Sequence, residues 1–257
     1  MASKAVKKNL SIGKALQIIE TMSAHSGPMR LQEVANAVSQ PPSTTLRFLN
    51  TLMDYGYADQ DSTNLHYFLT LKFCRIGSLI SRQIKMREVI RPYLEVLSRK
   101  FGESTCLAIS QDNLVVYIDV VDGPDHILQA LQRIGKIAPL HSTGVGKCLL
   151  LDCTQEEISR LAAAGLTGLT KNTLQSESEL QAEIMRVRKQ GFGEDNEECE
   201  IGVRCVAAPV RDYSGKVVAA ISTSGPTHRL TGDKLKLVRT ELPVTAQGIS
   251  QRLGYDV

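Results

Sequence analysis

Polar side chains in one short segment have the chemistry to read double-stranded DNA. Ser43, Arg47 and Asn50 fall on one face of a predicted helix over residues 43–55. Arg47 can donate two hydrogen bonds to guanine or contact a phosphate, and Ser43 and Thr44 can bond phosphates or base edges. The simpler alternative makes Ser43 only a helix cap and Arg47 only a solvated charge. The elements around this helix favour DNA contact, and the predicted contact residues are Ser43, Thr44, Thr45, Arg47 and Asn50.

The elements that surround this segment predict a winged helix-turn-helix. A helix over 31–38 comes first, and Pro41 and Pro42 end it and shape the turn. The second helix ends at Gly56, where a C-terminal glycine is expected. Turn-forming residues at 61–64 then separate two strand-like runs that predict a hairpin wing, 57–60 and 66–69. This order of elements places the second helix in a DNA major groove.

Apolar stripes on two helices predict the core of this region. An earlier helix over 12–22, with Ser11 as its cap, is expected to pack behind the other two helices. Its stripe consists of Ile12, Ala15, Leu16 and Ile19. The stripe of the DNA-reading helix consists of Thr45, Phe48, Leu49 and Leu52.

The charge of the chain is unevenly distributed. The 257 residues carry a net charge of +3, from 30 Lys and Arg against 27 Asp and Glu. Residues 1–80 hold eight of the basic and five of the acidic residues, so the remainder is neutral. The whole positive excess therefore lies with the helix-turn-helix, where phosphate contacts would need it, although a solvated basic face would look the same.

The segment Ser142-Thr143-Gly144-Val145-Gly146 is a second place where residue types suggest chemistry. Its small residues would let a ligand approach backbone amides at the start of a helix, where the helix dipole favours an anion such as a carboxylate. It is not a phosphate-binding P-loop, because Lys147 is followed by Cys148. The alternative is that the glycines only allow close packing between a helix and a strand.

Metal, disulfide and membrane chemistry are not expected. His141, Asp195, Cys199 and Cys205 are suitable ligand types, but their spacing matches no zinc motif, so we predict no metal and no cofactor. The six cysteines are scattered without paired spacing, as in reduced cytoplasmic proteins. No apolar run is long enough to span a membrane, and the basic N-terminus lacks the apolar region of a secretory signal.

The second half of the chain predicts an α+β domain in which helices cover an antiparallel sheet. A linker helix, over about 71–81, is expected to lead into it. Further helices are predicted over 86–101, 155–164, 177–190 and 231–253, the last of them bent or frayed by Pro243 and Gly248. The predicted strands are 105–110, 114–121, 203–211 and 217–224, with a further apolar run at 126–131. Strands in hairpins, with helices between and after them, favour this class.

Several motifs in a fixed order resemble the IclR family of bacterial transcriptional regulators. They extend from about Leu10 to Tyr255 and comprise 42–49, 67–70, 139–147, 193–198, 202–205 and 221–226. The chain departs from the family pattern at Pro42, where a polar or basic residue is usual, and at Leu46, where Tyr or His is frequent. Both departures remove side chains that could contact DNA.

The resemblance implies a fold, partners and a binding site. It implies a winged helix-turn-helix over 1–70, a linker helix over 71–85, and a GAF-like effector domain over 86–257 that also forms oligomers. Family members act as dimers or tetramers on pseudo-palindromic operators. With the small-residue segment, the implied effector site is Ser142, Thr143, Gly144, Val145, Asp195, Cys205, Ser222 and Ser224. Glu197, Glu198 and Glu200 are expected on the surface, and Cys205 could equally be a core residue.

The function expected from these observations is a ligand-responsive, cytoplasmic regulator, a homodimer or homotetramer that represses catabolic genes. It would bind double-stranded operator DNA and sense a small organic acid, either a sugar acid or a carboxylate of an aromatic pathway. The alternative is an enzyme that acts on a small carboxylate and uses the helix-turn-helix as a tether. Against the enzyme, the sequence has no nucleophile elbow, no HExxH motif and no dinucleotide fingerprint.

Overall fold

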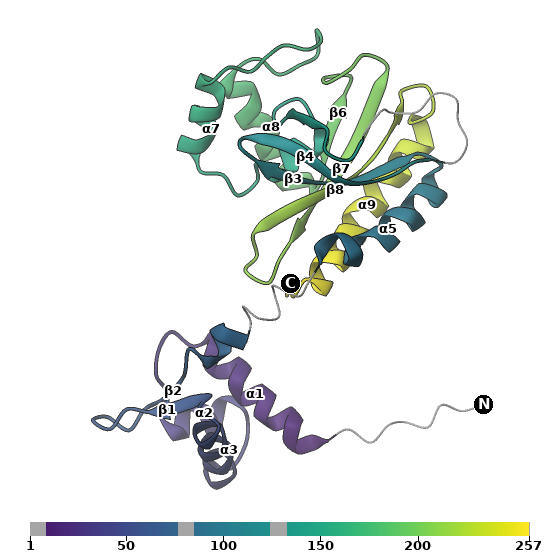
Figure 1. Ribbon diagram of the computed structural model, residues 1–257. Coiled ribbons are helices and arrows are strands. Elements are labelled where there is room, and N and C mark those ends of the chain that lie inside the picture. The colour runs from purple at the N-terminus through teal and green to yellow at the C-terminus, as the bar shows by residue number, and fades with distance from the viewer. Residues whose placement is uncertain (1–8, 77–84, 124–132, 257) are drawn as a thin grey trace, which may run out of the picture. The chain divides into compact units, whose positions relative to one another are not determined.

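The computed structural model describes residues 9–76, 85–123 and 133–256 of the chain. The chain divides into two compact units, Met1–Ile84 and Lys85–Val257. Each unit has its own buried core (Figure 1).

The first unit is a winged helix. Three helices, α1 (Leu10–Ala24), α2 (Leu31–Ala37) and α3 (Pro42–Asp54), precede an antiparallel hairpin of β1 (Ala58–Gln60) and β2 (Tyr67–Leu69). The predicted order of helix, helix-turn-helix and wing is therefore confirmed. The turn of the wing is held by Asp61, whose carboxylate accepts the backbone N–H groups of Thr63 at 2.7 Å and Asn64 at 3.3 Å. The bond from Thr63 is the main cause that lowers the pKa of Asp61.

Helix α3 begins one residue before the predicted start. Pro41 lies in extended backbone at the N-cap position, and Pro42 is the first helical residue. Proline suits this position because its missing N–H would have no acceptor inside the helix. The alternative that made Ser43 only the helix cap is not supported, because Ser43 is the second residue of the helix. At the other end Gly56 adopts a φ of +71°, which is the left-handed backbone that favours glycine after a helix.

The predicted stripe and cap of α1 were wrong. Ile18 and Met22 are buried in the core of the unit, whereas Ile12 is 59% exposed and Leu16 is 52% exposed. The cap is Asn9, whose side chain accepts the N–H groups of residues 11 and 12. Apolar residues occur on more than one face of this helix, so the helical period alone could not decide which face packs.

Two predicted elements fall at the edge of the described residues. Residues 72–76 are helical, but the rest of the predicted linker helix, 77–84, lies outside the described part of the chain. The apolar run 126–131 also lies outside it. The domain limits at 70, 71–85 and 86 therefore stay predictions.

The second unit is built on one antiparallel sheet. Its strands are β3 (Ser104–Gln111), β4 (Leu114–Val121), β5 (Ile137–Pro139), β6 (Gly193–Asn196), β7 (Val203–Arg211) and β8 (Val217–Pro226). They lie in the order β5-β4-β3-β8-β7-β6. Both edge strands, β5 and β6, were missing from the sequence prediction. They are short, and β6 is rich in acidic residues, which are depleted in strands.

Helices cover both faces of this sheet, so the predicted α+β class is confirmed (Figure 1). On one face α5 (Met86–Phe101) and α9 (Gly232–Arg252) pack on Leu107, Val206 and Ile221. Helix α9 continues through Pro243 and Gly248. The other face carries α6 (Gly144–Leu149), α7 (Gln155–Ala163) and α8 (Glu177–Gln190). Neighbouring strand residues alternate between the two cores, as the pleat requires.

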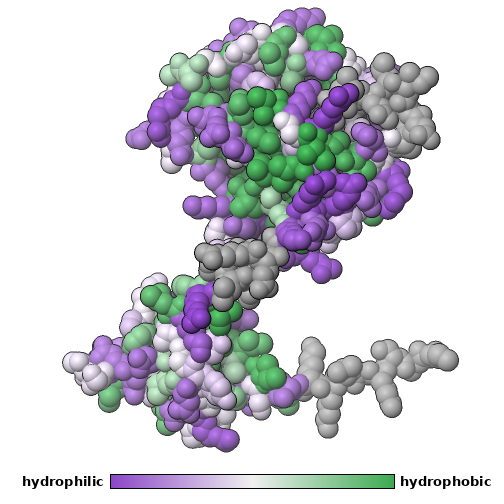
Figure 2. Space-filling model, in the orientation of Figure 1, coloured by the Kyte–Doolittle hydropathy of each residue, from purple (hydrophilic) through white to green (hydrophobic). Residues whose placement is uncertain are grey.

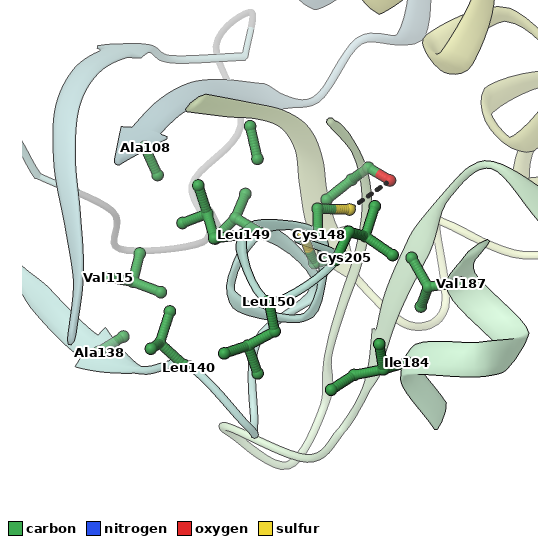
Figure 3. Packing of buried hydrophobic residues seen from close by; sticks show 14 of the residues in the cluster. Ala108, Val115, Ala138, Leu140, Cys148, Leu149, Leu150, Ile184, Val187 and Cys205 are labelled. Atoms are coloured by element: carbon green, nitrogen blue, oxygen red, sulfur yellow. Dashed lines mark hydrogen bonds between the residues drawn. The ribbon is translucent and has the colours of Figure 1, made fainter. Parts of the chain in front are cut away.

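Helix α6 lies at the centre of the core between the sheet and helices α7 and α8. Figure 3 shows Cys148, Leu149 and Leu150 between the strand side chains Ala108 and Val115 and the α8 side chains Ile184 and Val187. All six residues of α6 are buried. Figure 2 shows apolar residues gathered over the middle of the sheet and hydrophilic ones over α5.

Candidate functional site

The exposed face of α3 carries most of the predicted DNA-contacting residues. Ser43, Arg47 and Asn50 are exposed, and Thr44 is half-buried. Thr45 is fully buried, and its hydroxyl donates to the carbonyl oxygen of Pro41 at 3.2 Å. Thr45 was placed among the DNA contacts and also in the core stripe, and the structure places it in the core. Thr45 therefore packs α3 against the core. Ser43, Arg47 and Asn50 point to solvent, and Thr44 lies at the edge of the exposed face.

Lys14 joins this face, although the sequence prediction did not include it. It lines a hollow of about 340 Å³ between the start of α1 and α3, together with Thr44 and Arg47. The hollow therefore holds two cations, which suits a phosphate group. Helix α1 was interpreted only as a support for the other helices. The position of Lys14, a basic residue in the first turns of α1, was the signal that could have added it to the predicted DNA contacts.

The second candidate site begins at the small-residue turn before α6. Ser142, Thr143, Gly144 and Val145 are all buried. Thr143 caps the helix, because its hydroxyl accepts the N–H of Gly146 at 3.1 Å and donates to a carbonyl oxygen of the preceding strand at 3.0 Å. Gly144 and Val145 are the first two helical residues, so their N–H groups have no acceptor within the helix. The predicted turn that opens a helix is confirmed.

The two glycines of this turn differ in what they permit. A Cβ atom at Gly146 would overlap the backbone of Leu140, so this glycine is required for packing. A Cβ at Gly144 would lie 3.3 Å from the carbonyl oxygen of Gly193 and 3.4 Å from the backbone nitrogen of Asp195, which is a milder contact. The packing alternative thus explains Gly146, whereas Gly144 places the start of α6 beside β6.

The strands bring the remaining predicted effector residues to the same place. Asp195 on β6 is paired with Cys205 on β7, and Cys205 is paired with Ser224 on β8. Paired residues of antiparallel strands point to the same side, so these three side chains form one polar row. Ser222 lies two positions along β8, and its hydroxyl is 2.9 Å from the sulfur of Cys106. Helix α6 packs on this side of β6, β7 and β8.

Asp195 is the one predicted acidic group in this cluster, and it is only 4% exposed. Its Oδ1 accepts the backbone N–H of Glu198 at 2.7 Å and that of Cys199 at 3.3 Å. Burial is the largest influence on Asp195 and raises its pKa to about 7, and the charge of Glu198 adds to this. The two N–H bonds and Lys147 oppose the shift. Asp195 can therefore exchange a proton near neutral pH.

The buried thiols and His141 show no sign of a catalytic or metal-binding role. Burial raises the pKa of Cys205 to about 12 and raises that of Cys106 further, so both thiols stay protonated at neutral pH. Protonated thiols are poor nucleophiles and poor metal ligands. His141 is buried, and its Nε2 lies 3.1 Å from the carbonyl oxygen of Thr167. Within residues 9–76, 85–123 and 133–256, no group of side chains is arranged to hold a metal ion.

The prediction that Glu198 lies on the surface was wrong. Glu198 is 8% exposed because Lys147, itself 1% exposed, extends from α6 to meet it. The Nζ of Lys147 donates to Glu198 at 2.6 Å, to the carbonyl oxygen of Glu194 at 2.7 Å and to Glu183 at 3.2 Å. The sequence prediction considered Lys147 only as part of a rejected P-loop. A lysine on an otherwise apolar helix was the signal for this buried ion-pair network.

The raised pKa of Asp195 predicts a pH-dependent stability. Its pKa is above the ordinary value of 3.8, so between about pH 4 and pH 7 the folded state holds a proton that the unfolded chain has released. The stabilisation is complete below the unfolded pKa and is lost as the pH rises through about 7. We expect the melting temperature of the wild type to fall over this range relative to Asp195→Asn, which cannot titrate. Parallel melting curves for the two proteins at every pH would contradict this prediction.

A winged helix with an exposed polar face, joined to a domain with a buried polar cluster, defines the class of DNA-binding regulators with a sensory domain. Sequence comparison identifies the family. The model of the IclR helix-turn-helix domain matches residues 11–62, and that of the bacterial transcriptional regulator IclR C-terminal domain matches residues 79–251. The chain belongs to the IclR family of bacterial transcriptional regulators.

Individual relatives agree with this assignment. The chain is 32% identical to the regulator XynR of Escherichia coli, over 95% of this chain and 97% of that one. It is 35% identical to KdgR of Dickeya chrysanthemi, with 88% and 74% covered, and 30% identical to the acetate operon repressor of Salmonella typhimurium, with 88% and 83% covered. These relatives are named as regulators, so the comparisons do not favour the alternative of a tethered enzyme.

Solved structures share the fold. A putative IclR regulator from a Silicibacter species superposes with a TM-score of 0.83 at 21% identity, covering 96% of both chains. The IclR protein of Thermotoga maritima superposes with a TM-score of 0.63 at 28% identity, covering 96% of this chain and 99% of that one. The chain is thus a helix-turn-helix regulator that binds DNA and responds to a ligand of its C-terminal domain. No helix among the described residues is long and apolar enough to cross a membrane.

Proposed function

We propose that this regulator represses catabolic genes and releases its operator when a small organic acid binds the second unit. The observation that carries this proposal is the polar row of Asp195, Cys205 and Ser224, which lies beside the start of α6. A buried row of polar groups in an otherwise apolar core is the composition of a small-molecule site. The effector residues are the eight predicted ones: Ser142, Thr143, Gly144, Val145, Asp195, Cys205, Ser222 and Ser224.

An acid suits the donors available at this site. The N–H groups of Gly144 and Val145 can donate to a carboxylate, and the adjacent serine hydroxyls can donate as well. A protonated Asp195 can donate a further hydrogen bond, and its pKa of about 7 leaves much of it protonated at neutral pH. A sugar acid or a carboxylate of aromatic degradation fits this chemistry. One relative is named the acetate operon repressor, so at least one similar protein represses an operon named for a small acid.

The DNA contacts of the proposal are Ser43, Thr44, Arg47 and Asn50 on α3, within a DNA-binding domain over 1–70. We propose that a linker helix over 71–85 joins it to the effector domain over 86–257. A dimer, or a tetramer of two dimers, would place two α3 helices on half-sites about 34 Å apart along the DNA. For this coupling, the effector must bind one arrangement of the two DNA-binding domains better than the other. A difference of about 1–3 kcal/mol would change operator affinity roughly 5–150-fold.

Replacing Asp195 by alanine tests the effector site. The variant is expected to bind the operator as the wild type does without ligand, but to need at least about tenfold more effector for release, because a hydrogen-bonding group is lost. The measurement is a gel-shift titration on the promoter of the neighbouring genes, with an effector chosen by a thermal-shift screen of metabolic carboxylates. Asp233→Ala is the matched control, because Asp233 is exposed on α9. A normal response of Asp195→Ala would show that the site is misplaced.

A further inference from the structure

A charged cleft lies at the edge of the sheet formed by β6. Its volume is about 290 Å³, and it is lined by Arg186, Glu194, Asn196, Glu198, Arg204, Leu235 and Arg239. Side chains of β6 alternate between faces, so Glu194 and Asn196 point to the side opposite Asp195. The cleft is therefore separate from the proposed effector site, although the same strand borders both.

Three arginines from three different elements meet at this cleft. Arg239 of α9 donates two hydrogen bonds to Glu194, at 2.9 and 3.0 Å. Arg204 of β7 donates to the side chain of Asn196 and to the carbonyl oxygen of Leu230, both at 2.8 Å. Arg186 of α8 donates twice to Glu183. A guanidinium has more N–H donors than these bonds use, so each arginine can still bind an oxyanion.

The charges of the lining favour an anion. With the ion-pair partners of the lining included, four cations (Arg186, Arg204, Arg239 and Lys147) face three carboxylates (Glu183, Glu194 and Glu198), which leaves an excess of one positive charge. Glu194 is already paired with Arg239 and lies 3.8 Å from Arg186. An anion bound between the arginines would therefore meet a net positive environment, shielded in part from water by the walls of the cleft.

One acceptor among the described residues of the lining lacks a well-formed hydrogen bond. The Oε1 of Glu198 binds Lys147, and the backbone N–H of Asn196 also interacts with the carboxylate, but the buried Oε2 has no well-formed hydrogen bond among the described residues. A buried acceptor without a donor is costly, so a donor is expected to fill the place. A simple anion could not supply this hydrogen bond, whereas a hydroxyl group could.

We propose that this cleft is a second ligand site, for a small hydroxylated oxyanion. The phosphate or carboxylate group would bind between Arg186, Arg204 and Arg239, and a hydroxyl group would donate to the Oε2 of Glu198. The cleft has room for a small metabolite only. This site goes beyond the proposed effector site and does not depend on it.

Glu198 connects the two sites. Its backbone N–H donates to Asp195 at 2.7 Å, and its carboxylate binds Lys147 of α6 at 2.6 Å. A ligand that binds the side chain of Glu198 in the cleft thus acts on a residue that holds Asp195 in the effector site. Ligands at the two sites are expected to change each other's affinity by the same factor.

Calorimetric titration of the full chain with glycerol 3-phosphate and with glycerate tests the proposal. At least one probe is expected to bind with a dissociation constant of about 1 mM or less. Glycerol, which lacks the oxyanion, is expected not to bind, and the stronger probe identifies phosphate or carboxylate as the preferred group. If neither probe binds, or if glycerol binds as well as they do, the proposal is wrong.

Variants locate the binding. Arg204→Gln and Arg186→Gln are each expected to weaken the probe about tenfold or more, because each removes a charged donor. Arg186 is half exposed, so its variant will fold even if Arg204→Gln does not. Arg99→Gln, an exposed arginine on α5, is the control and should bind normally. Unchanged binding to folded Arg186→Gln and Arg204→Gln would overturn the proposal, because the probe would then bind outside this cleft.

Discussion

Replacing Arg47 by alanine is expected to abolish specific operator binding. Arg47 is exposed on α3 and shares a hollow with Lys14 and Thr44. A bidentate contact of arginine to guanine contributes about 1–3 kcal/mol of discrimination, and a dimer would lose it at both half-sites. The combined loss of about 4 kcal/mol corresponds to a roughly thousandfold weaker complex. Fluorescence anisotropy with the operator and with a scrambled duplex of equal length measures this loss.

The same variant separates DNA binding from ligand binding. Thermal stabilisation by the effector should be unchanged in Arg47→Ala, because Arg47 and the polar row lie in different compact units. Arg99→Ala, which removes the same charge from an exposed position on α5, should bind the operator as the wild type does. If Arg47→Ala loses both DNA binding and ligand stabilisation, Arg47 has a structural role and the DNA face is wrongly assigned. Normal operator binding by this variant would contradict the assignment directly.

Replacing Lys147 by methionine is expected to destabilise the second unit by roughly 3–5 kcal/mol, the usual effect of breaking a buried ion pair. Methionine keeps most of the apolar length of lysine but removes the ammonium group. Glu198 would then lose its buried cation, whereas Glu183 would keep its ion pair with Arg186. The melting temperature of this unit is expected to fall by roughly 10 °C or more. Thermal unfolding followed by circular dichroism measures the change.

A double-mutant cycle tests whether the ion pair is the cause. Adding Glu198→Gln to Lys147→Met removes one unpaired charge, so the double variant should be more stable than Lys147→Met alone. Lys216→Met, at an exposed lysine before β8, is the matched control and should melt like the wild type. If the double variant loses the sum of the two single losses, the buried pair makes no contribution and lost packing explains the result.

Much of the first unit could be predicted from local chemistry. The prolines at 41 and 42, the glycine at 56 and the turn at 61–64 each restrict the backbone within a few residues, and all three features occur where expected. The same local signals placed the starts and ends of α7 and α8 to within about one residue. The packing face of α1 could not be predicted this way, because which face is buried depends on the helices opposite it.

The predictions of site residues also succeeded or failed according to whether they depended on neighbours in the sequence or on distant residues. The row of Asp195, Cys205 and Ser224 was implied by family resemblance, and the strand register places the three residues side by side. The assignment of Thr45 to the DNA face failed because its own position in the core stripe was the stronger signal. The surface prediction for Glu198 failed because its partner, Lys147, is 51 residues away in the chain.

The sequence by itself determined the order of elements, the winged helix and the α+β class, because helical period, strand alternation and turn chemistry act between near neighbours. The tertiary structure alone decided the strand order, the edge strand within the acidic segment, and the burial of Lys147 with Glu198 and Glu183. Those features depend on contacts between residues far apart in the chain. The carboxylate of Glu198 is buried beside a cation that lies far away in the chain, and no local pattern records that meeting.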